Sequence, residues 1–244
     1  MHENETSRPY LSLILPAYNE QARIGTTLAA VEGYLQSLGE SFEIIAVDDG
    51  STDATLSALR ECAADSDVLR IISYEGNAGK GHAVRQGVFA ARGEYVAFTD
   101  VDLSAPIEEM SKLFAALDKG YDIAIGSRAV KEAIIPVHQP LHRELGGKGL
   151  NLVIRALAVP GIHDTQCGFK LFRGDVAREI FAKCFINGWG FDIEVLYLAR
   201  KMGYSIAEVG VQWSHAEGSK LQPLRAGLQV LKDIFRIRTH YYGA

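Results

Sequence analysis

The sequence predicts an α/β fold, GT-A-like in outline: a mostly parallel central sheet flanked by helices, with a mixed second half. Two observations carry this prediction. Short apolar runs alternate along the first half with longer segments whose apolar residues recur at helical spacing. Several of the apolar runs stop abruptly at acidic or glycine-rich turns, as strands do where they reach the edge of a sheet. We therefore expect helices on both faces of the sheet.

The first two elements show both patterns. Residues 11–15 form an apolar run that Pro16 ends, so we expect a first buried strand there. Residues 20–38 carry apolar side chains every three or four positions, which predicts a helix that Gly39 ends. Asn19 precedes this helix and is expected to cap it.

The later elements follow from the same patterns. The expected strands are residues 42–47, 68–73, 94–99, 121–125, 167–172 and 205–213. The expected helices are residues 54–63, 82–91, 106–117, 145–158, 175–183, 191–202 and 224–239. Thr52 or Asp53 is expected to cap the helix at 54, and Pro106 suits a first helical turn. Residues 129–140 contain two prolines and are expected to form a loop.

Composition narrows the class of protein. The chain has 244 residues and a net charge of −5, which argues against a general nucleic-acid binder. Three cysteines without a C-x-x-C pair point to a reducing compartment and no disulfide framework. No apolar run approaches the ~18 residues of a membrane span, and residues 1–9 do not resemble a signal peptide. We expect a cytoplasmic protein, soluble or peripheral.

An acidic pair follows the strand expected at 94–99. Asp100 and Asp102 are one residue apart, and in an extended segment they would point to the same side. Two carboxylates held close together are costly unless a cation lies between them, and Mg²⁺ or Mn²⁺ takes such oxygen ligands together with substrate phosphates. The pair therefore predicts a metal-bound diphosphate. An ordinary strand-to-loop turn rich in Asp is the alternative.

Two further loops are candidates for the same rim of the sheet. Asp48 and Asp49 end the second strand, where a carboxylate can bind ribose or a base N–H, although the segment also reads as a plain turn. Residues 75–81 hold three glycines and Lys80, but match neither a Walker loop nor the Rossmann fingerprint. The backbone amides of residues 75–81 and the Lys80 side chain could face a diphosphate. Alternatively, the segment could be a turn with a helix cap. Three loops that follow strand ends, residues 16–20, 48–53 and 100–104, are expected to meet at one rim of the sheet.

Eight motifs in order carry a family resemblance. They are Leu-Pro-Ala-Tyr-Asn-Glu at 15–20, Val-Asp-Asp-Gly-Ser at 47–51, Asn-Ala-Gly-Lys-Gly at 77–81, Asp-Val-Asp at 100–102, Gly-Ser-Arg at 126–128, Asp-Thr-Gln-Cys-Gly-Phe-Lys-Leu-Phe at 164–172, Gly-Phe-Asp-Ile-Glu at 190–194 and Gly-Ser-Lys-Leu at 218–221. Together they resemble the inverting family 2 glycosyltransferases of GT-A fold. Within that family they look like the dolichyl-phosphate β-glucosyltransferases and other polyprenyl-phosphate glycosyltransferases, more than the dolichyl-phosphate mannose synthases.

The resemblance implies roles for particular residues. The nucleotide-sugar site would use Pro16, Tyr18, Glu20, Val47, Asp49, Lys80, Asp100, Val101, Asp102, Arg128 and Lys220. The metal would be held by Asp100 and Asp102, with Asp102 as the principal ligand. Arg128 and Asp164 would join Asp102 in catalysis.

The implied reaction moves a hexose, foremost glucose from UDP-glucose, to a dolichyl or undecaprenyl phosphate. A lipid phosphate is already ionised and needs cations rather than a base, and the candidates besides Lys220 are Arg128, Arg143 and Lys148. The alternative interpretation is that Arg143 and Lys148 are solvated surface charges and that Asp164 caps local structure. A sugar-hydroxyl acceptor would instead require a carboxylate base, for which the candidates are Asp164, Asp192 and Glu194. A GDP-mannose donor, a nucleotidyltransferase and a non-enzymatic binding module stay open as alternatives.

The chain is expected to be a single catalytic domain over residues 1–244. Residues 10–125 would bind the nucleotide sugar, residues 126–222 the acceptor, and residues 223–240 would form a C-terminal amphipathic helix. Between Lys220 and Ala244 there are five basic residues and one acid. Such a helix can lie in a membrane interface at the inner face of the membrane, although its apolar residues could instead pack on the domain. Trp189 also has more than one interpretation, since its ring could stack on a sugar, contact a lipid or pack in the core.

Overall fold

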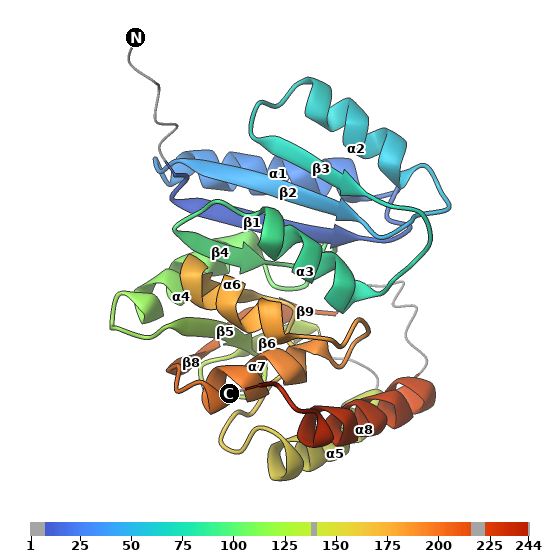
Figure 1. Cartoon of the computed structure of the whole chain (residues 1–244). Coiled ribbons are helices and arrows are strands. Elements are labelled where there is room, and N and C mark those ends of the chain that lie inside the picture. Colours follow the sequence, from blue (N-terminus) through green and yellow to red (C-terminus); the bar gives the residue numbers. More distant parts are fainter. Residues whose placement is uncertain (1–7, 138–140, 216–222, 244) are drawn as a thin grey trace.

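The computed structural model describes residues 8–137, 141–215 and 223–243, and gives only the backbone for residue 137 and residues 141–148 and 223–226. Figure 1 shows a central sheet covered by helices on both faces. The strands are β1 (Leu11–Ala17), β2 (Phe42–Asp48), β3 (Leu69–Ser73), β4 (Tyr95–Phe98), β5 (Ile123–Ser127), β6 (Ile134–Val137), β7 (Lys170–Arg173), β8 (Ile206–Gly210) and β9 (Gln212–Ser214). The helices are α1 (Ile24–Ser37), α2 (Thr55–Ala64), α3 (Lys80–Ala90), α4 (Met110–Leu117) after the short 3₁₀ turn η1 (Ile107–Glu109), α5 (Leu141–Leu157), α6 (Gly174–Lys183), α7 (Phe191–Lys201) and α8 (Pro223–Thr239).

The main sheet has the strand order β3-β2-β1-β4-β7-β5-β8. The first four strands in this order are parallel to one another, and β5 is parallel to β8. Only β7 runs against its two neighbours, β4 and β5. The predicted mostly parallel sheet with a mixed second half is therefore confirmed.

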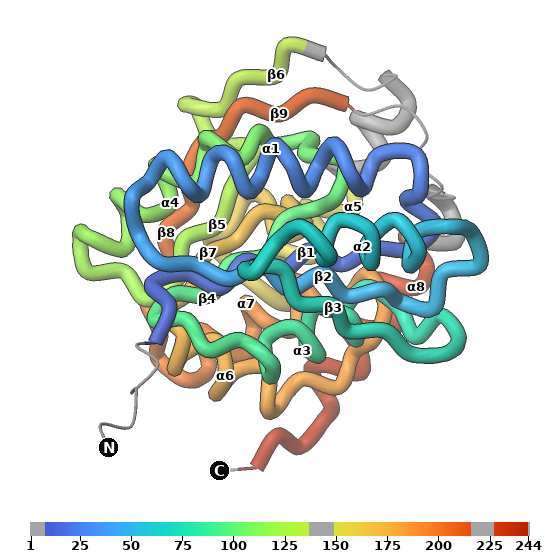
Figure 2. Tube along the Cα trace, turned by 90° about the horizontal axis from the view of Figure 1, so that it is seen from above, coloured from blue at the N-terminus to red at the C-terminus, as the bar shows by residue number. Residues whose placement is uncertain are grey.

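Two apolar clusters lie on opposite faces of the sheet. One face is covered by α3, α6, α7 and α8, whose apolar side chains pack against Phe98 and Phe172. The other face is covered by α1, α2 and α4, which pack against Leu13 and Leu171. Figure 2, viewed from above, shows α1 and α3 on opposite sides of the strands. Burying the alternate side chains of each strand on both faces explains why the strands read as continuous apolar runs.

The parallel pairing fixes where the loops lie. Because β2, β1 and β4 run in the same direction side by side, residues 18–20, 49–53 and 99–104 leave the sheet at the same rim. Hydrogen bonds join two of these loops: Ser51 Oγ accepts from the Asn19 amide at 2.9 Å, and Asn19 Oδ1 accepts from the Thr52 amide at 2.8 Å. The expected meeting of three loops at one rim is confirmed.

Several local expectations were wrong. Asn19 does not cap the first helix, because it adopts φ 55° in the exit loop and α1 begins only at Ile24. Residues 129–140 were expected to be loop throughout, but Ile134–Val137 forms β6 and pairs with β9 in a second, two-stranded sheet. The strand expected over 205–213 is divided at Val211 into β8 and β9, which belong to different sheets.

Candidate functional site: an acidic loop at the rim of the sheet

The acidic pair lies in a turn rather than in an extended segment. β4 ends at Phe98, the Asp100 carbonyl accepts from the Leu103 amide at 3.1 Å, and Leu103 has φ 44°. The expectation that both carboxylates extend to the same side of a strand was therefore wrong. The turn is anchored from beneath, because the Val101 side chain is buried and its carbonyl accepts from Thr27 Oγ1 at 2.7 Å.

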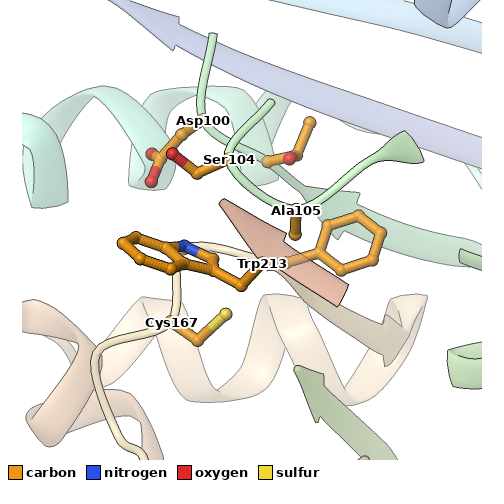
Figure 3. A pocket seen from close by; sticks show the side chains of 8 residues that line it. Asp100, Ser104, Ala105, Cys167 and Trp213 are labelled. Atoms are coloured by element: carbon orange, nitrogen blue, oxygen red, sulfur yellow. The ribbon is translucent and has the colours of Figure 1, made fainter. Parts of the chain in front are cut away.

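The two carboxylates have different surroundings. Asp100 is 39% exposed and its Oδ1 lies 2.5 Å from Lys80 Nζ. Asp102 is exposed, and its Oδ1 accepts from the Ser104 amide at 2.9 Å. Gly168 lies directly behind Asp100, where any added Cβ would overlap the carboxylate. Figure 3 shows Asp100 and Ser104 on one side of a small hollow, with Trp213 and Cys167 on the other.

These donors fit a hard divalent cation. Within residues 8–136, 149–215 and 227–243, no group of three or more His, Cys, Asp or Glu side chains is arranged to hold a metal ion alone. Mg²⁺ and Mn²⁺ commonly take one or two carboxylates and complete their shell with water and phosphate oxygens. Asp100 and Asp102 offer two carboxylates at an open rim, which suits an ion that arrives with a diphosphate.

A buried row of charges continues inward from Asp100. Lys170 is fully buried, and its Nζ donates to the Cys167 carbonyl at 2.6 Å and to Asp192 Oδ1. Burial would lower the pKa of Lys80, but the charges of Asp100 and Asp192 raise it above its ordinary value. Burial raises the pKa of Asp192, and the nearby Lys170 and Lys80 only partly offset this.

A groove lies at the same rim, between the first two loops and the segment after β3. It has a volume of ≈ 480 Å³, within the usual range of ~300–1,000 Å³ for small-molecule sites. Its walls are Tyr18, Asp48, Gly50, Ser51, Thr52, Leu56, Ser73, Tyr74, Glu75, Gly76 and Asn77. Tyr18 is 38% exposed and offers a ring face to a planar base.

Asp49 lies beneath the groove rather than in its wall. Its carboxylate is buried and accepts from Tyr74 Oη at 2.8 Å, Asn77 Nδ2 at 2.8 Å and the amides of Ala78 and Gly79 at 2.9 and 3.0 Å. Asp49 therefore holds residues 74–79 in place. Burial and the hydrogen bond to Asp49 also raise the pKa of Tyr74, so Tyr74 remains a donor.

The glycine loop uses its amides within the protein. The Ala78 and Gly79 amides bond Asp49, and the His82 amide donates to the Asn187 carbonyl at 3.1 Å. An added Cβ at Gly79 or Gly81 would overlap the backbone of this Asn187 loop. In this arrangement Lys80 is the group of the loop that faces the acidic turn.

Arg128 and Asp164 form one unit. Arg128 follows β5, and its Nε and Nη2 donate to the two oxygens of Asp164 at 2.6 and 2.8 Å, while its amide donates at 2.9 Å. Burial alone would raise the pKa of Asp164, but the charge and hydrogen bonds of Arg128 hold it below its usual value. The guanidinium lies 5.2 Å from the ring of Trp213, which lines the hollow beside Asp100.

The other predicted site residues are placed as follows. Pro16 lies within β1, and the Glu20 carboxylate lies 2.8 Å from Arg23 Nε. Val47 is wholly buried in the core, so only its backbone can face the groove. Arg143 and Lys148 lie on α5 where only the backbone is described, and Lys220 lies outside the described residues.

Sequence reasoning missed three contributors to this site: Lys170, Gly168 and Trp213. The signal for Lys170 was a lysine within the mostly apolar run expected as a strand at 167–172, because such a charge is buried only with a partner. Trp213 and Gly168 gave no such signal, since their roles depend on which segments meet in space.

Comparison with known proteins shows which family this chain belongs to. The family model described as "Glycosyl transferase family 2" matches residues 12–181. A dolichyl-phosphate beta-glucosyltransferase of Dictyostelium discoideum is 36% identical over 252 residues, covering 98% of this chain and 77% of its own length. The proteins of the same name from Mus musculus and Homo sapiens are 38% and 37% identical, covering 95% of this chain and 75% of theirs.

The chain belongs to glycosyltransferase family 2.

Solved structures agree with the family in fold. Glucosyl-3-phosphoglycerate synthase from Mycobacterium tuberculosis, solved with Mn²⁺, UDP and phosphoglyceric acid, has a TM-score of 0.73 at 21% identity, covering 96% of this chain and 80% of its own. The same enzyme with Mn²⁺ and UDP-glucose has a TM-score of 0.70 at 21% identity, covering 94% and 79%. The expected GT-A fold is confirmed, and the family 2 assignment makes the protein a glycosyltransferase.

Proposed function

We propose that this family 2 glycosyltransferase moves glucose from UDP-glucose to a polyprenyl phosphate, with inversion and with Mg²⁺ or Mn²⁺. The names of its relatives support the donor sugar and the lipid acceptor. The Mn²⁺ and UDP bound in structures of the same fold support the cofactor and the base. The exposed carboxylate of Asp102 and the partly exposed carboxylate of Asp100 would provide the corresponding ligands here.

The hydrogen bonds made by three buried carboxylates indicate which class of acceptor the enzyme uses. A sugar-hydroxyl acceptor requires a base, and Asp164, Asp192 and Glu194 were the candidates. Asp164 is bound on both oxygens by Arg128, and Asp192 is bound on Oδ1 by Lys170. Glu194 accepts hydrogen bonds from the amides of Phe185 and Ile186 and from the hydroxyl of Tyr242. Because all three are engaged inside the protein, we infer an acceptor that is already ionised, as a lipid phosphate is.

The protein's own residues would divide the work as follows. Asp102 and Asp100 would hold the metal, which neutralises negative charge on the departing nucleoside diphosphate. The groove beside Tyr18 would hold the uridine, shaped by the loop that Asp49 fixes. Arg128 would use its remaining N–H edge to orient phosphate oxygens, since Asp164 occupies the other edge.

A donor and acceptor screen tests this function. Purified full-length protein with Mn²⁺ is given UDP-glucose, UDP-galactose or GDP-mannose together with undecaprenyl phosphate, dolichyl phosphate or unphosphorylated polyprenol. We expect UDP release and a glucosylated lipid only with UDP-glucose and a phosphorylated lipid. Equal transfer to the polyprenol would contradict the acceptor class, a preference for GDP-mannose would contradict the donor, and diphosphate release from a nucleoside triphosphate would indicate a nucleotidyltransferase.

We also propose that α8, together with α5, places the enzyme on a membrane surface. One face of α8 packs on the domain through Val230, Ile234 and Ile237. The opposite face exposes apolar side chains, and α5 beside it does the same; these are Leu228 (64%), Leu231 (41%), Phe235 (69%), Leu152 (67%) and Leu157 (46%). Figure 1 shows the two helices side by side at one end of the molecule. The alternative that Leu228, Leu231 and Phe235 pack on the domain does not fit this exposure.

Charge supports a bilayer as the occupant of this surface. Residues 220–244 contain Lys220, Arg225, Lys232, Arg236 and Arg238 but only one acid, Asp233. Basic groups beside exposed leucines and phenylalanine suit anionic lipid headgroups above acyl chains. No helix in residues 8–137, 141–215 and 223–243 is long and apolar enough to cross a membrane. The free thiols of Cys62, Cys167 and Cys184 agree with the reducing, cytoplasmic side.

Liposome sedimentation tests the membrane proposal. The double substitution Leu228→Ser with Phe235→Ser removes exposed side chains only, so the protein should stay folded but lose salt-sensitive binding to anionic vesicles. The matched control is Phe89→Ser on α3, which is 52% exposed away from α8 and should bind as before. Unchanged sedimentation of the double variant would exclude this surface.

A further inference from the structure

Lys80 lies beside Asp100, one of the two carboxylates proposed above to hold the metal. Its Nζ lies 2.5 Å from Asp100 Oδ1, and its side chain is only 11% exposed. The ammonium also lies 5.3 Å from the centre of the Trp189 ring and 6.0 Å from that of Phe191. Lys80 is the first residue of α3, so its backbone is fixed while its long side chain can change direction.

The charges around Lys80 form a balanced set. Asp100 and Asp192 are negative, Lys80 and Lys170 are positive, and each carboxylate has an ammonium beside it. Asp192 also contributes to stabilising the charge of Lys80. A divalent cation bound at Asp100 would add two positive charges within a few ångströms of the Lys80 ammonium. At that distance like charges repel strongly in a partly buried site, because the effective dielectric constant there is well below that of water.

We propose that Lys80 is a resident counter-ion of Asp100 that the divalent metal displaces, so that metal and nucleotide bind together rather than independently. This rests on the metal-dependent donor chemistry proposed above. The displaced ammonium has two anionic partners: the Asp192 carboxylate, and the diphosphate that arrives with the metal. Without the diphosphate, the displaced Lys80 ammonium has only the Asp192 carboxylate as an anionic partner, so the metal binds poorly.

Calorimetry with Mn²⁺ alone tests the displacement. In the absence of nucleotide, Lys80→Met should bind Mn²⁺ about tenfold or more tightly than the wild-type protein, since the competing charge is gone. Lys80→Gln is a second uncharged variant and should behave in the same way. Lys80→Arg keeps the charge beside Asp100 and should stay weak. Lys112→Met is the matched control, because Lys112 pairs with Glu109 at 2.6 Å on an exposed surface; it should bind Mn²⁺ as the wild type does.

The coupling between ligands gives a second measurement. UDP should strengthen Mn²⁺ binding to the wild-type protein, and by linkage Mn²⁺ should strengthen UDP binding by the same factor. In Lys80→Met and Lys80→Gln this factor should fall several-fold. In these variants no ammonium is displaced, so the diphosphate has no displaced charge to stabilise. An unchanged factor in both variants would overturn the proposal.

The fluorescence of Trp189 can report the movement of Lys80. The chain has two tryptophans, so Trp213→Phe leaves Trp189 as the single reporter beside Lys80. Adding Mn²⁺ with UDP should change Trp189 emission as the ammonium leaves the ring, and the change should be lost when Lys80→Met is added. A signal that persists without Lys80 would show that the emission reports something else and would count against the movement.

The outcomes separate this proposal from the proposed function. The Mn²⁺ titration uses neither a sugar nor a lipid, so a gain of affinity in Lys80→Met supports the displacement even if UDP-glucose is not turned over. If UDP-glucose is turned over but neither uncharged variant gains Mn²⁺ affinity, the function stands and the displacement is wrong.

Discussion

Aspartates in this protein differ in function because they differ in partners. Asp49 accepts hydrogen bonds on both oxygens and fixes a loop, and Asp164 is held by a guanidinium. Asp102, in contrast, is exposed and is tied to the protein by the amide of Ser104. A carboxylate that is already satisfied inside the protein has little to offer a ligand. The available carboxylate of Asp102 is therefore expected to be the principal metal ligand, with Asp100 as the second.

The substitution Asp102→Asn tests this assignment. Asn keeps an oxygen for the Ser104 amide but loses the negative charge, so the turn should persist while metal binding fails. We expect kcat/KM to fall by about 100-fold or more, in line with the several kcal/mol that a metal contributes to such reactions. Mn²⁺ calorimetry should show the loss directly, and Asp118→Asn, an exposed residue at the C-terminal end of α4, serves as the control. Near-normal turnover of Asp102→Asn at saturating Mn²⁺ would remove Asp102 as a ligand.

Asp233 on α8 is predicted to destabilise the fold at neutral pH. It is buried, its Oδ2 has no hydrogen-bond partner among the described residues, and burial raises its pKa above the ordinary value. A carboxyl with a raised folded-state pKa costs stability as pH rises from its unfolded value near 3.8 through the folded value. Asp233→Asn should therefore raise the melting temperature at pH 7 by a few degrees, about 1 kcal/mol.

The pH dependence checks the cause. The advantage of Asp233→Asn over the wild type should shrink as pH falls, and vanish below the unfolded pKa, where the aspartate is neutral in both states. Thermal unfolding between pH 3.5 and 7.5 measures this. A constant difference across the range would mean that the effect is steric rather than electrostatic.

At the scale of elements, the close approach of two loops shapes the nucleotide groove. Gly50 follows β2 with φ +65°, and a Cβ added there would overlap the backbone of Gly76. Both glycines line the groove. Only a residue without a side chain allows the two loops to meet at this distance.

The substitution Gly50→Ala should therefore separate the loops. We expect UDP affinity to fall about tenfold and the free energy of unfolding to fall by about 1–3 kcal/mol, the usual cost of backbone strain. Gly33→Ala is the matched control: Gly33 is exposed in α1 with no atom within 4 Å of an added Cβ. It should leave UDP binding unchanged and raise stability by about 0.5–1 kcal/mol. Equal effects of the two substitutions would contradict the role of Gly50.

Periodicity predicted most elements of the first half because β1, β2 and β4 are buried on both faces and each helix is buried on one. It failed where neighbours rather than local pattern decide. β6 contains Pro136, and its pairing with β9 depends on a chain segment about 80 residues away. Likewise the loop composition located Asp100, Asp102 and Lys80, but the pairs Arg128–Asp164 and Lys170–Asp192 exist only because β5, β7 and α7 meet.

At the scale of the whole molecule, the strand order joins the two halves of the chain. β7 lies between β4 and β5, and β8 completes the edge. We propose on this basis that residues 10–240 form one folding unit. Thermal unfolding followed by circular dichroism and by tryptophan fluorescence should give a single, coincident transition, since Trp189 and Trp213 both lie in the second half. Two separated transitions would show that the halves are independent domains.

The antiparallel position of β7 has a consequence for how the chain is made. During synthesis, β1 to β4 emerge long before residues 170–173, so the apolar strand Tyr95–Phe98 has one edge paired with β1 and the other open. An open apolar edge invites pairing with another chain. The nascent first half would therefore depend on rapid completion of the chain, or on a chaperone, to avoid aggregation. The acidic turn after β4 would also gain its backing glycine, Gly168, only then, so the metal site would be completed well after β4 has formed.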